Sequence, residues 1–163
     1  MIAAAAHLDE SHAAVPEAVA RLRNAVAAYA RAAGLAGERL DAVRLAVSET
    51  VTNVVLHAYQ DGPGEVRVSA RVTAGELLVL VADDGCGPSL PSPRPGLGWG
   101  LAFVTDACDR FTLAERPGGG TEASMAFRLP GGRAPGAGRQ ADPRSGALGQ
   151  DCPPRPSQRR AHS

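Results

Sequence analysis

The sequences DDGCG at residues 83–87 and GLGWGL at residues 96–101 form two glycine clusters, with a short proline-rich run between them. Glycine at every second position permits positive φ angles and lets a ligand approach main-chain N–H groups without a Cβ in the way. The second cluster leads directly into a helix-compatible stretch, so its glycines lie where helix N-terminal amides can bind an anion. We interpret the two clusters as a nucleotide site around which the chain is organised.

The first glycine cluster follows a predicted strand at residues 76–82, whose Leu-Leu-Val-Leu-Val core is the most apolar run in the chain. Asp83 therefore leaves the end of a buried strand. A carboxylate held there, beside glycines, can accept a hydrogen bond from an amino group such as that of adenine. An acidic loop that only caps a strand end is the alternative, and glycine-rich turns are common, so the interpretation depends on the other motifs.

Two helices are predicted before this region, at residues 16–33 and at about residues 38–59, from apolar residues at three- and four-residue spacing. Glu49 and Asn53 share one face of the second helix, because they are four residues apart. The carboxylate can accept a proton or orient a hydroxyl, and the carboxamide can offer its oxygen to a magnesium ion. Alternatively, the two side chains form the solvated edge of the helix.

The remaining elements predict a sheet. Alternating apolar and polar residues indicate a half-buried strand at residues 65–73, and residues 110–114 and 121–129 are predicted to form a hairpin after a helix at about residues 99–108. Residues 1–6 are too few to span a membrane and are expected to be an edge strand or a frayed end. The predicted fold class is α+β, a two-layer sandwich of a mixed, mostly antiparallel sheet with the helices on one face.

Length and composition predict one domain, over residues 1–130, and a disordered tail over residues 131–163 that is rich in Gly, Pro and Arg. Lys+Arg and Asp+Glu number 17 each, which argues against direct nucleic-acid binding, and no membrane segment is expected. Every basic residue is Arg, so a Walker-type phosphate loop, which needs Lys, is excluded. Three cysteines without a secretory signal favour the cytoplasm.

Taken together, four motifs resemble those of the GHKL ATPases, the superfamily of gyrase, the large heat-shock chaperones, mismatch-repair ATPases and histidine kinases. The motifs are Glu49-x-x-x-Asn53 in a helix, Asp83-x-Gly85-x-Gly87 after a strand, Gly96-x-Gly98-x-Gly100-Leu101 before a helix, and Gly120-Thr121 opening the last strand. The resemblance covers roughly residues 13–129 and implies a Bergerat-type ATP-binding fold. The sequences SETVTN and PGGGTE, at residues 48–53 and 117–122, are further similar to the anti-sigma-factor serine/threonine-protein kinases of bacterial sporulation and stress switches.

The resemblance implies ATP and Mg²⁺ as cofactors. Asp83 would bind the adenine amino group, supported by Thr121 through a hydroxyl or a water, and Asn53 would ligate the magnesium ion. Glu49 would be the general base that takes the proton from a protein serine, which is worth about two to four powers of ten in rate. The remaining expected nucleotide contacts are Gly85, Gly87, Gly96, Gly98, Gly100 and Leu101, with the last three glycines at the phosphates.

The segment between the two glycine clusters departs from the family pattern. Residues 88–95 are short and contain four prolines, so we expect an abbreviated, stiff ATP lid. Arg94 is the only cation in this segment and is the candidate contact for the terminal phosphate, with a solvent-facing arginine as the alternative.

The leading hypothesis on this resemblance is a cytoplasmic serine kinase that binds a sigma factor and phosphorylates an anti-anti-sigma (STAS-type) protein, with a homodimer left open. The alternative is a non-catalytic ATP-binding module that sequesters a protein partner. Leu45 and Leu56, on the far side of the second helix from its core face, would suit the binding surface of such a module.

Overall fold

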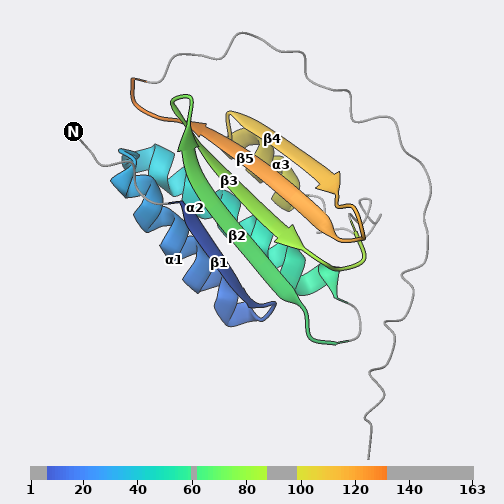
Figure 1. Ribbon diagram of the computed structural model, residues 1–163. Helices are drawn as coiled ribbons and strands as arrows, with labels where there is room; N and C mark the ends of the chain where they lie inside the picture. Colours follow the sequence, from blue (N-terminus) through green and yellow to red (C-terminus); the bar gives the residue numbers. More distant parts are fainter. Residues whose placement is uncertain (1–6, 60–61, 88–98, 132–163) are drawn as a thin grey trace, which may run out of the picture.

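The computed structural model describes residues 7–59, 62–87 and 99–131, and it has two layers (Figure 1). The elements are β1 (Leu8–Ala13), α1 (Pro16–Ala32), α2 (Gly37–Asn53), the π-helical turn η1 (Val54–Ala58), β2 (Glu65–Thr73), β3 (Glu76–Asp83), α3 (Trp99–Ala107), β4 (Arg110–Glu115) and β5 (Thr121–Arg128). Figure 1 shows the helices together behind one face of the sheet. The predicted α+β sandwich with helices on one face is confirmed.

The sheet has five strands in the order β1-β2-β3-β5-β4, and all four pairings are antiparallel. A mixed sheet was expected, but no parallel pair occurs among the described strands. The most apolar strand, β3, is the central one, and its Val79 lies between Ala70 of β2 and Met125 of β5. Asp83, at the carboxyl end of β3, is therefore surrounded by other elements.

The core lies between the sheet and the helices. Along β2, Val66, Val68 and Ala70 are buried against the helices, whereas Arg67 and Arg71 are exposed on the other face, as the alternation predicted. The largest fully buried side chains are Phe127, Leu22, Leu35, Leu77, Met125, Val26, Val43, Val47, Val51, Val66, Val68 and Val79. Each such side chain contributes about 1.5–3 kcal/mol of hydrophobic stabilisation, so this layer holds the two helices against the sheet.

The helix boundaries agree with the sequence pattern except at one end. α1 begins with Pro16 in its first turn, and Gly34, with φ +101°, ends it. The second predicted helix, residues 38–59, is present as α2, but its last turn is the π-helix η1. Apolar periodicity cannot distinguish an α-helical from a π-helical turn, because the same residues stay apolar in both.

The first strand of the described sheet was not predicted from the sequence. The edge strand is β1, Leu8–Ala13, whereas the predicted edge-strand position at residues 1–6 lies outside the described residues. Its sequence, LDESHA, has little intrinsic strand preference, but it pairs with β2 over its whole length, and the N–H of Ala14 donates to the carbonyl of Gly64 at 2.8 Å. Pairing with a neighbour, rather than local propensity, creates this strand.

Both long helices, α1 and α2, have 17 residues. Within residues 7–59, 62–87 and 99–131, none of the helices combines the length and the apolar character that crossing a bilayer requires. The expected disordered tail lies outside the described residues, apart from Gly131.

Candidate nucleotide-binding site

Asp83 is a buried carboxylate at the centre of the sheet's end. It is the last residue of β3, and its side chain points to the helix layer because it pairs with Val66 of β2 on that face. Asp83 is only 4 % exposed, and its Oδ1 accepts hydrogen bonds from the N–H groups of Gly85 at 2.8 Å and Thr121 at 3.3 Å. Neither bond uses Oδ2. Thr121 thus contacts Asp83 through its backbone amide, and the expected support through a hydroxyl or a water stays a prediction.

The pKa of Asp83 is raised above its ordinary value. Burial is the largest cause, and the hydrogen bonds from Gly85 and Thr121 oppose it. Neutral amides, rather than a guanidinium, hold the carboxylate itself. A buried acceptor of this kind is arranged to receive a donor from a ligand.

Two glycines allow three backbone segments to meet beside Asp83. A Cβ at Gly85 would overlap the carbonyl of Ala58 in η1, and a Cβ at Gly120, whose φ is +91°, would overlap the carbonyl of Asp83. The N–H of Cys86 donates to that same Ala58 carbonyl at 3.0 Å. Glycine is therefore needed here for backbone-to-backbone packing, which brings η1, the end of β3 and the start of β5 together.

The turn η1 directs the end of the second helix toward this corner. It begins directly after Asn53, and π-helical turns are rare and often occur at functional sites. Tyr59 follows it and donates its hydroxyl hydrogen to the carbonyl of Glu65 at 2.6 Å, while the hydroxyl oxygen accepts the N–H of Asp84 at 3.1 Å. This contact ties the helix end to the residue after Asp83.

Glu49 and Asn53 lie one turn apart in the last two turns of α2, and both side chains are half-buried. Thr50 next to them faces the sheet, and its hydroxyl donates to the carbonyl of Ala46 at 2.7 Å and contacts the sulfur of Met125 at 3.6 Å. No hydrogen bond or ion pair joins Glu49 or Asn53 to another side chain within the described part of the chain. Both groups are therefore available to a ligand.

The other predicted site residues fall into two groups. Gly100 and Leu101 lie in the first turn of α3, as the motif before a helix predicted, and Gly87 has a φ of +84° in the loop after β3. Arg94, Gly96 and Gly98, together with the expected short lid, lie outside the described residues.

Residues 12–127 match the family described as "Histidine kinase-like ATPase domain". The chain belongs to this family. The match covers α1, α2, α3 and the strands β2 to β5 up to residue 127, with only the last two residues of β1, and it confirms the resemblance to GHKL ATPases seen in the motifs.

Curated relatives of the ATPase domain belong to the anti-sigma and serine-kinase branch. The anti-sigma F factor of Clostridium acetobutylicum is 32% identical over 114 residues, which are 63% of this chain and 80% of that protein. The serine-protein kinase RsbW of Bacillus licheniformis is 34% identical over 96 residues, 58% of this chain and 60% of that protein. The predicted branch of the superfamily is thereby confirmed.

Solved structures share the fold. A structure of the RsbU and RsbW domains of Rv1364c from Mycobacterium tuberculosis has a TM-score of 0.56 at 25% identity, over 76% of this chain and 32% of that chain. A blue-light activated histidine kinase from Erythrobacter litoralis has a TM-score of 0.50 at 24% identity, over 71% of this chain and 42% of that chain.

The residues of the ATPase domain fit a magnesium nucleotide. Asp83 supplies a buried acceptor for an amino group, and Asn53 supplies an uncommitted amide oxygen. Among the described residues no group of three or more His, Cys, Asp or Glu could hold a metal by itself. Magnesium that arrives with phosphates needs few protein ligands, because phosphate and water oxygens fill most of its coordination sphere.

Arg116, in the turn between β4 and β5, belongs to the same corner and was missed by the sequence reasoning. Its Nη1 donates to the carbonyl of Asp83 at 2.9 Å and forms an ion pair with Asp84. It precedes the motif Pro117-Gly118-Gly119-Gly120-Thr121, but a single arginine before a turn carries no signal of the acceptor it will reach 33 residues earlier.

Proposed function

We propose that this ATPase domain transfers the terminal phosphate of ATP to a serine of an anti-anti-sigma (STAS-type) protein and binds a sigma factor in the cytoplasm. The observation that carries the proposal is the uncommitted pair Glu49 and Asn53 on a helix whose end is bonded to the Asp83 corner. The names of the relatives, anti-sigma F factor and serine-protein kinase, support the choice of acceptor and partner.

In this proposal the adenine end is recognised by Asp83, whose Oδ2 accepts the amino hydrogen while Oδ1 stays bonded to Gly85 and Thr121. Asn53 provides one oxygen ligand to magnesium, which neutralises charge on the phosphates when it is bound. The amides at the start of α3, with Gly100 and Leu101, face the phosphate charge favourably because they are at a helix N-terminus.

Glu49 acts as the general base. Its carboxylate takes the proton of the acceptor serine as the serine oxygen forms a bond to the terminal phosphorus. The bond from that phosphorus to the bridging oxygen breaks, and ADP leaves with the electron pair. The half-buried position of Glu49 limits its contact with water, yet it leaves the carboxylate reachable by a protein substrate.

The test is transfer of label from ATP labelled at its terminal phosphate, with magnesium, to anti-anti-sigma proteins encoded near this gene. Glu49→Gln is expected to lower the transfer rate by about two to four powers of ten while ATP affinity stays unchanged. Glu38→Gln, an exposed acid in the first turn of the same helix, is the matched control and should transfer like wild type. Full transfer by Glu49→Gln would remove this residue from the mechanism.

A second candidate function is a non-catalytic module whose ATP-bound form sequesters a partner. It is favoured by two exposed leucines, Leu45 on α2 at 43% and Leu56 on η1 at 63%. Leu45→Asp should then weaken partner capture without changing ATP affinity, whereas Val72→Asp, an equally exposed position on β2, should not. Tight ATP binding and partner capture without any label transfer would favour this candidate over the kinase.

A further inference from the structure

The turn between β4 and β5 holds Arg116 in a defined position. The N–H of Arg116 donates to the carbonyl of Gly120 at 3.1 Å, and the N–H of Gly119 donates back to the carbonyl of Arg116 at 3.0 Å. Gly118, Gly119 and Gly120 all have positive φ angles, between 91° and 100°. Such a turn depends on glycine and leaves the backbone of Arg116 little freedom.

The side chain of Arg116 crosses from this turn to the peptide group between Asp83 and Asp84. Nη1 donates to the carbonyl oxygen of that peptide, and the N–H of the same peptide donates to the hydroxyl of Tyr59. Because a peptide group is planar, contacts at its two ends fix its orientation, and with it the direction of the Asp83 side chain. The ion pair with Asp84 adds a third point of attachment.

We propose that Arg116 is a positioning residue for the nucleotide, which together with Tyr59 orients the Asp83 carboxylate toward the base. The inference rests on the proposed role of Asp83 in ATP binding. The N–H of Thr121 that reaches Asp83 directly follows the turn that holds Arg116, so a change in that turn would also move this amide relative to the carboxylate.

Arg116 and Asp84 act on Asp83 in opposite senses. Asp83 has a raised pKa chiefly because of burial; beyond that, the charge of Asp84 raises it further and the charge of Arg116 lowers it. From the end of the second helix, the hydroxyl of Tyr59 reaches this corner. Two variants that break the same ion pair are therefore expected to shift the titration of Asp83 in opposite directions.

The experiment measures ATP dissociation constants by calorimetry at several pH values, with a melting temperature for every variant. Arg116→Gln is expected to weaken ATP binding about tenfold at neutral pH, because a charged donor to the Asp83 peptide is lost. Arg116→Lys should recover part of the affinity through the remaining charge. Arg110→Gln is the matched control, since Arg110 pairs with Glu76 at 2.8 Å at the other end of the sheet, and it should leave ATP affinity unchanged.

The measurements of ATP affinity at several pH values distinguish a positioning role of Arg116 from a purely structural one. Affinity that needs ionised Asp83 falls as the pH drops through the pKa of Asp83. In Arg116→Gln this fall should begin at higher pH than in wild type, and in Asp84→Asn at lower pH. Equal shifts in both variants, or wild-type affinity in Arg116→Gln, would overturn the inference.

The remaining outcomes are also decisive. If Arg116→Gln does not fold, Asp84→Asn and Tyr59→Phe carry the test, and wild-type affinity and pH profiles in both would reject it. Wild-type protein that fails to bind ATP at all would refute the nucleotide site, and the inference with it. ATP binding without phosphotransfer would refute only the proposed kinase activity, and the role of Arg116 would stand.

Discussion

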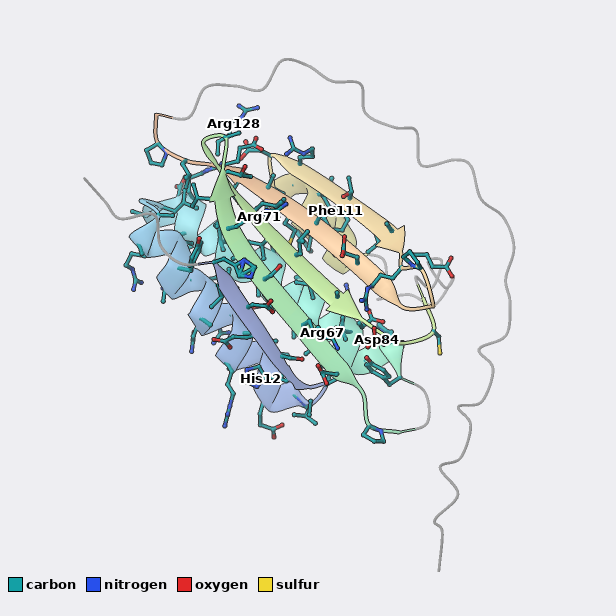
Figure 2. All side chains as sticks on the ribbon, viewed as in Figure 1. His12, Arg67, Arg71, Asp84, Phe111 and Arg128 are labelled. Atoms are coloured by element: carbon teal, nitrogen blue, oxygen red, sulfur yellow. The ribbon has the colours of Figure 1, made fainter. Side chains whose placement is uncertain are left out.

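The two ends of the sheet each hold a carboxylate, and the pKa values of these two carboxylates are shifted in opposite directions. At the nucleotide end, Asp83 is held by backbone amides and its pKa is raised by burial. At the other end, Asp109 accepts the N–H of Arg128 at 2.8 Å and pairs with Arg39, and these contacts outweigh its burial and lower its pKa. Figure 2 shows Asp84 and Arg128 at these two ends.

This difference suggests a structural role for Asp109 and a ligand-binding role for Asp83. A carboxylate neutralised by guanidinium groups has no further demand for a donor, so Asp109 joins α2, β4 and β5 as a structural contact. The carboxylate of Asp83 accepts hydrogen bonds only from neutral amides, so its charge is compensated less than that of Asp109; this costs stability in the absence of a ligand and favours a ligand that brings a donor. Binding sites commonly accept such a cost.

Asp83→Asn should give the largest effect. We expect ATP affinity to fall by about tenfold to a hundredfold. The variant replaces the charged acceptor with a neutral carboxamide, whose own N–H donor can face the adenine amino group. Calorimetric titration measures this loss. The free energy of unfolding should hold or rise, since the buried charge is removed, and a large destabilisation would contradict the comparison.

Asp109→Asn should show the reverse behaviour. The free energy of unfolding is expected to fall by about 2 kcal/mol, because Arg39 and the N–H of Arg128 lose a charged acceptor in a partly buried site. Denaturant unfolding measures it. ATP affinity should match wild type, and a nucleotide-binding defect here would show that the two ends are coupled.

The pH dependence of stability should separate the two carboxylates. The folded pKa of Asp109 is below its unfolded value of about 3.8, so its stabilisation is present above that pH and is lost as the pH falls through the lower folded value. The folded pKa of Asp83 is raised above its unfolded value of about 3.8, so its cost is absent below that pH and grows as the pH rises from there through the folded value. The free energy of unfolding should therefore be measured against pH. The values for Asp109→Asn and wild type should become equal only in strong acid. The free energies of unfolding of Asp83→Asn and wild type should become equal at a higher pH.

The smallest expected effect concerns the reactivity of the Cys108 thiol. Burial raises the pKa of its thiol to about 12, with the neighbouring charge of Asp109 as a second cause. The native thiol should therefore react slowly with iodoacetamide at pH 8, when compared by mass spectrometry with the unfolded chain. Asp109→Asn should accelerate the reaction only slightly. Rapid labelling of Cys108 in the folded wild type would show that this end is looser than the structure indicates.

Much of the fold could be predicted because its signals are local. The apolar spacing in α1 and α2 and the alternation in β2 depend on which face each residue buries, and a window of the sequence shows that directly. β1 has no such signal, because its sequence is polar and it is a strand only through pairing with β2. The π-helical form of η1 was likewise invisible, since helix type depends on backbone bonds.

The residues of the candidate site also differ in whether local sequence signals predicted them. Glu49 with Asn53, and Asp83 at a strand end, could be found because their chemistry and spacing are contained in short motifs. Support of Asp83 by Thr121 through a hydroxyl or a water stays a prediction, whereas the contact of the Thr121 amide with Asp83 was not foreseen. Arg116 could not be found, because its acceptors lie 32 and 33 residues away.

The sequence by itself therefore determined the residue types of the site, the order of the elements and the family. Only the tertiary structure decided which of these groups are neutralised and which remain available to a ligand. The physical reason is that neutralisation depends on contacts between distant segments, such as the ion pairs of Arg39 with Asp109 and of Arg116 with Asp84. The apolar pattern that folds the chain does not specify these polar contacts residue by residue.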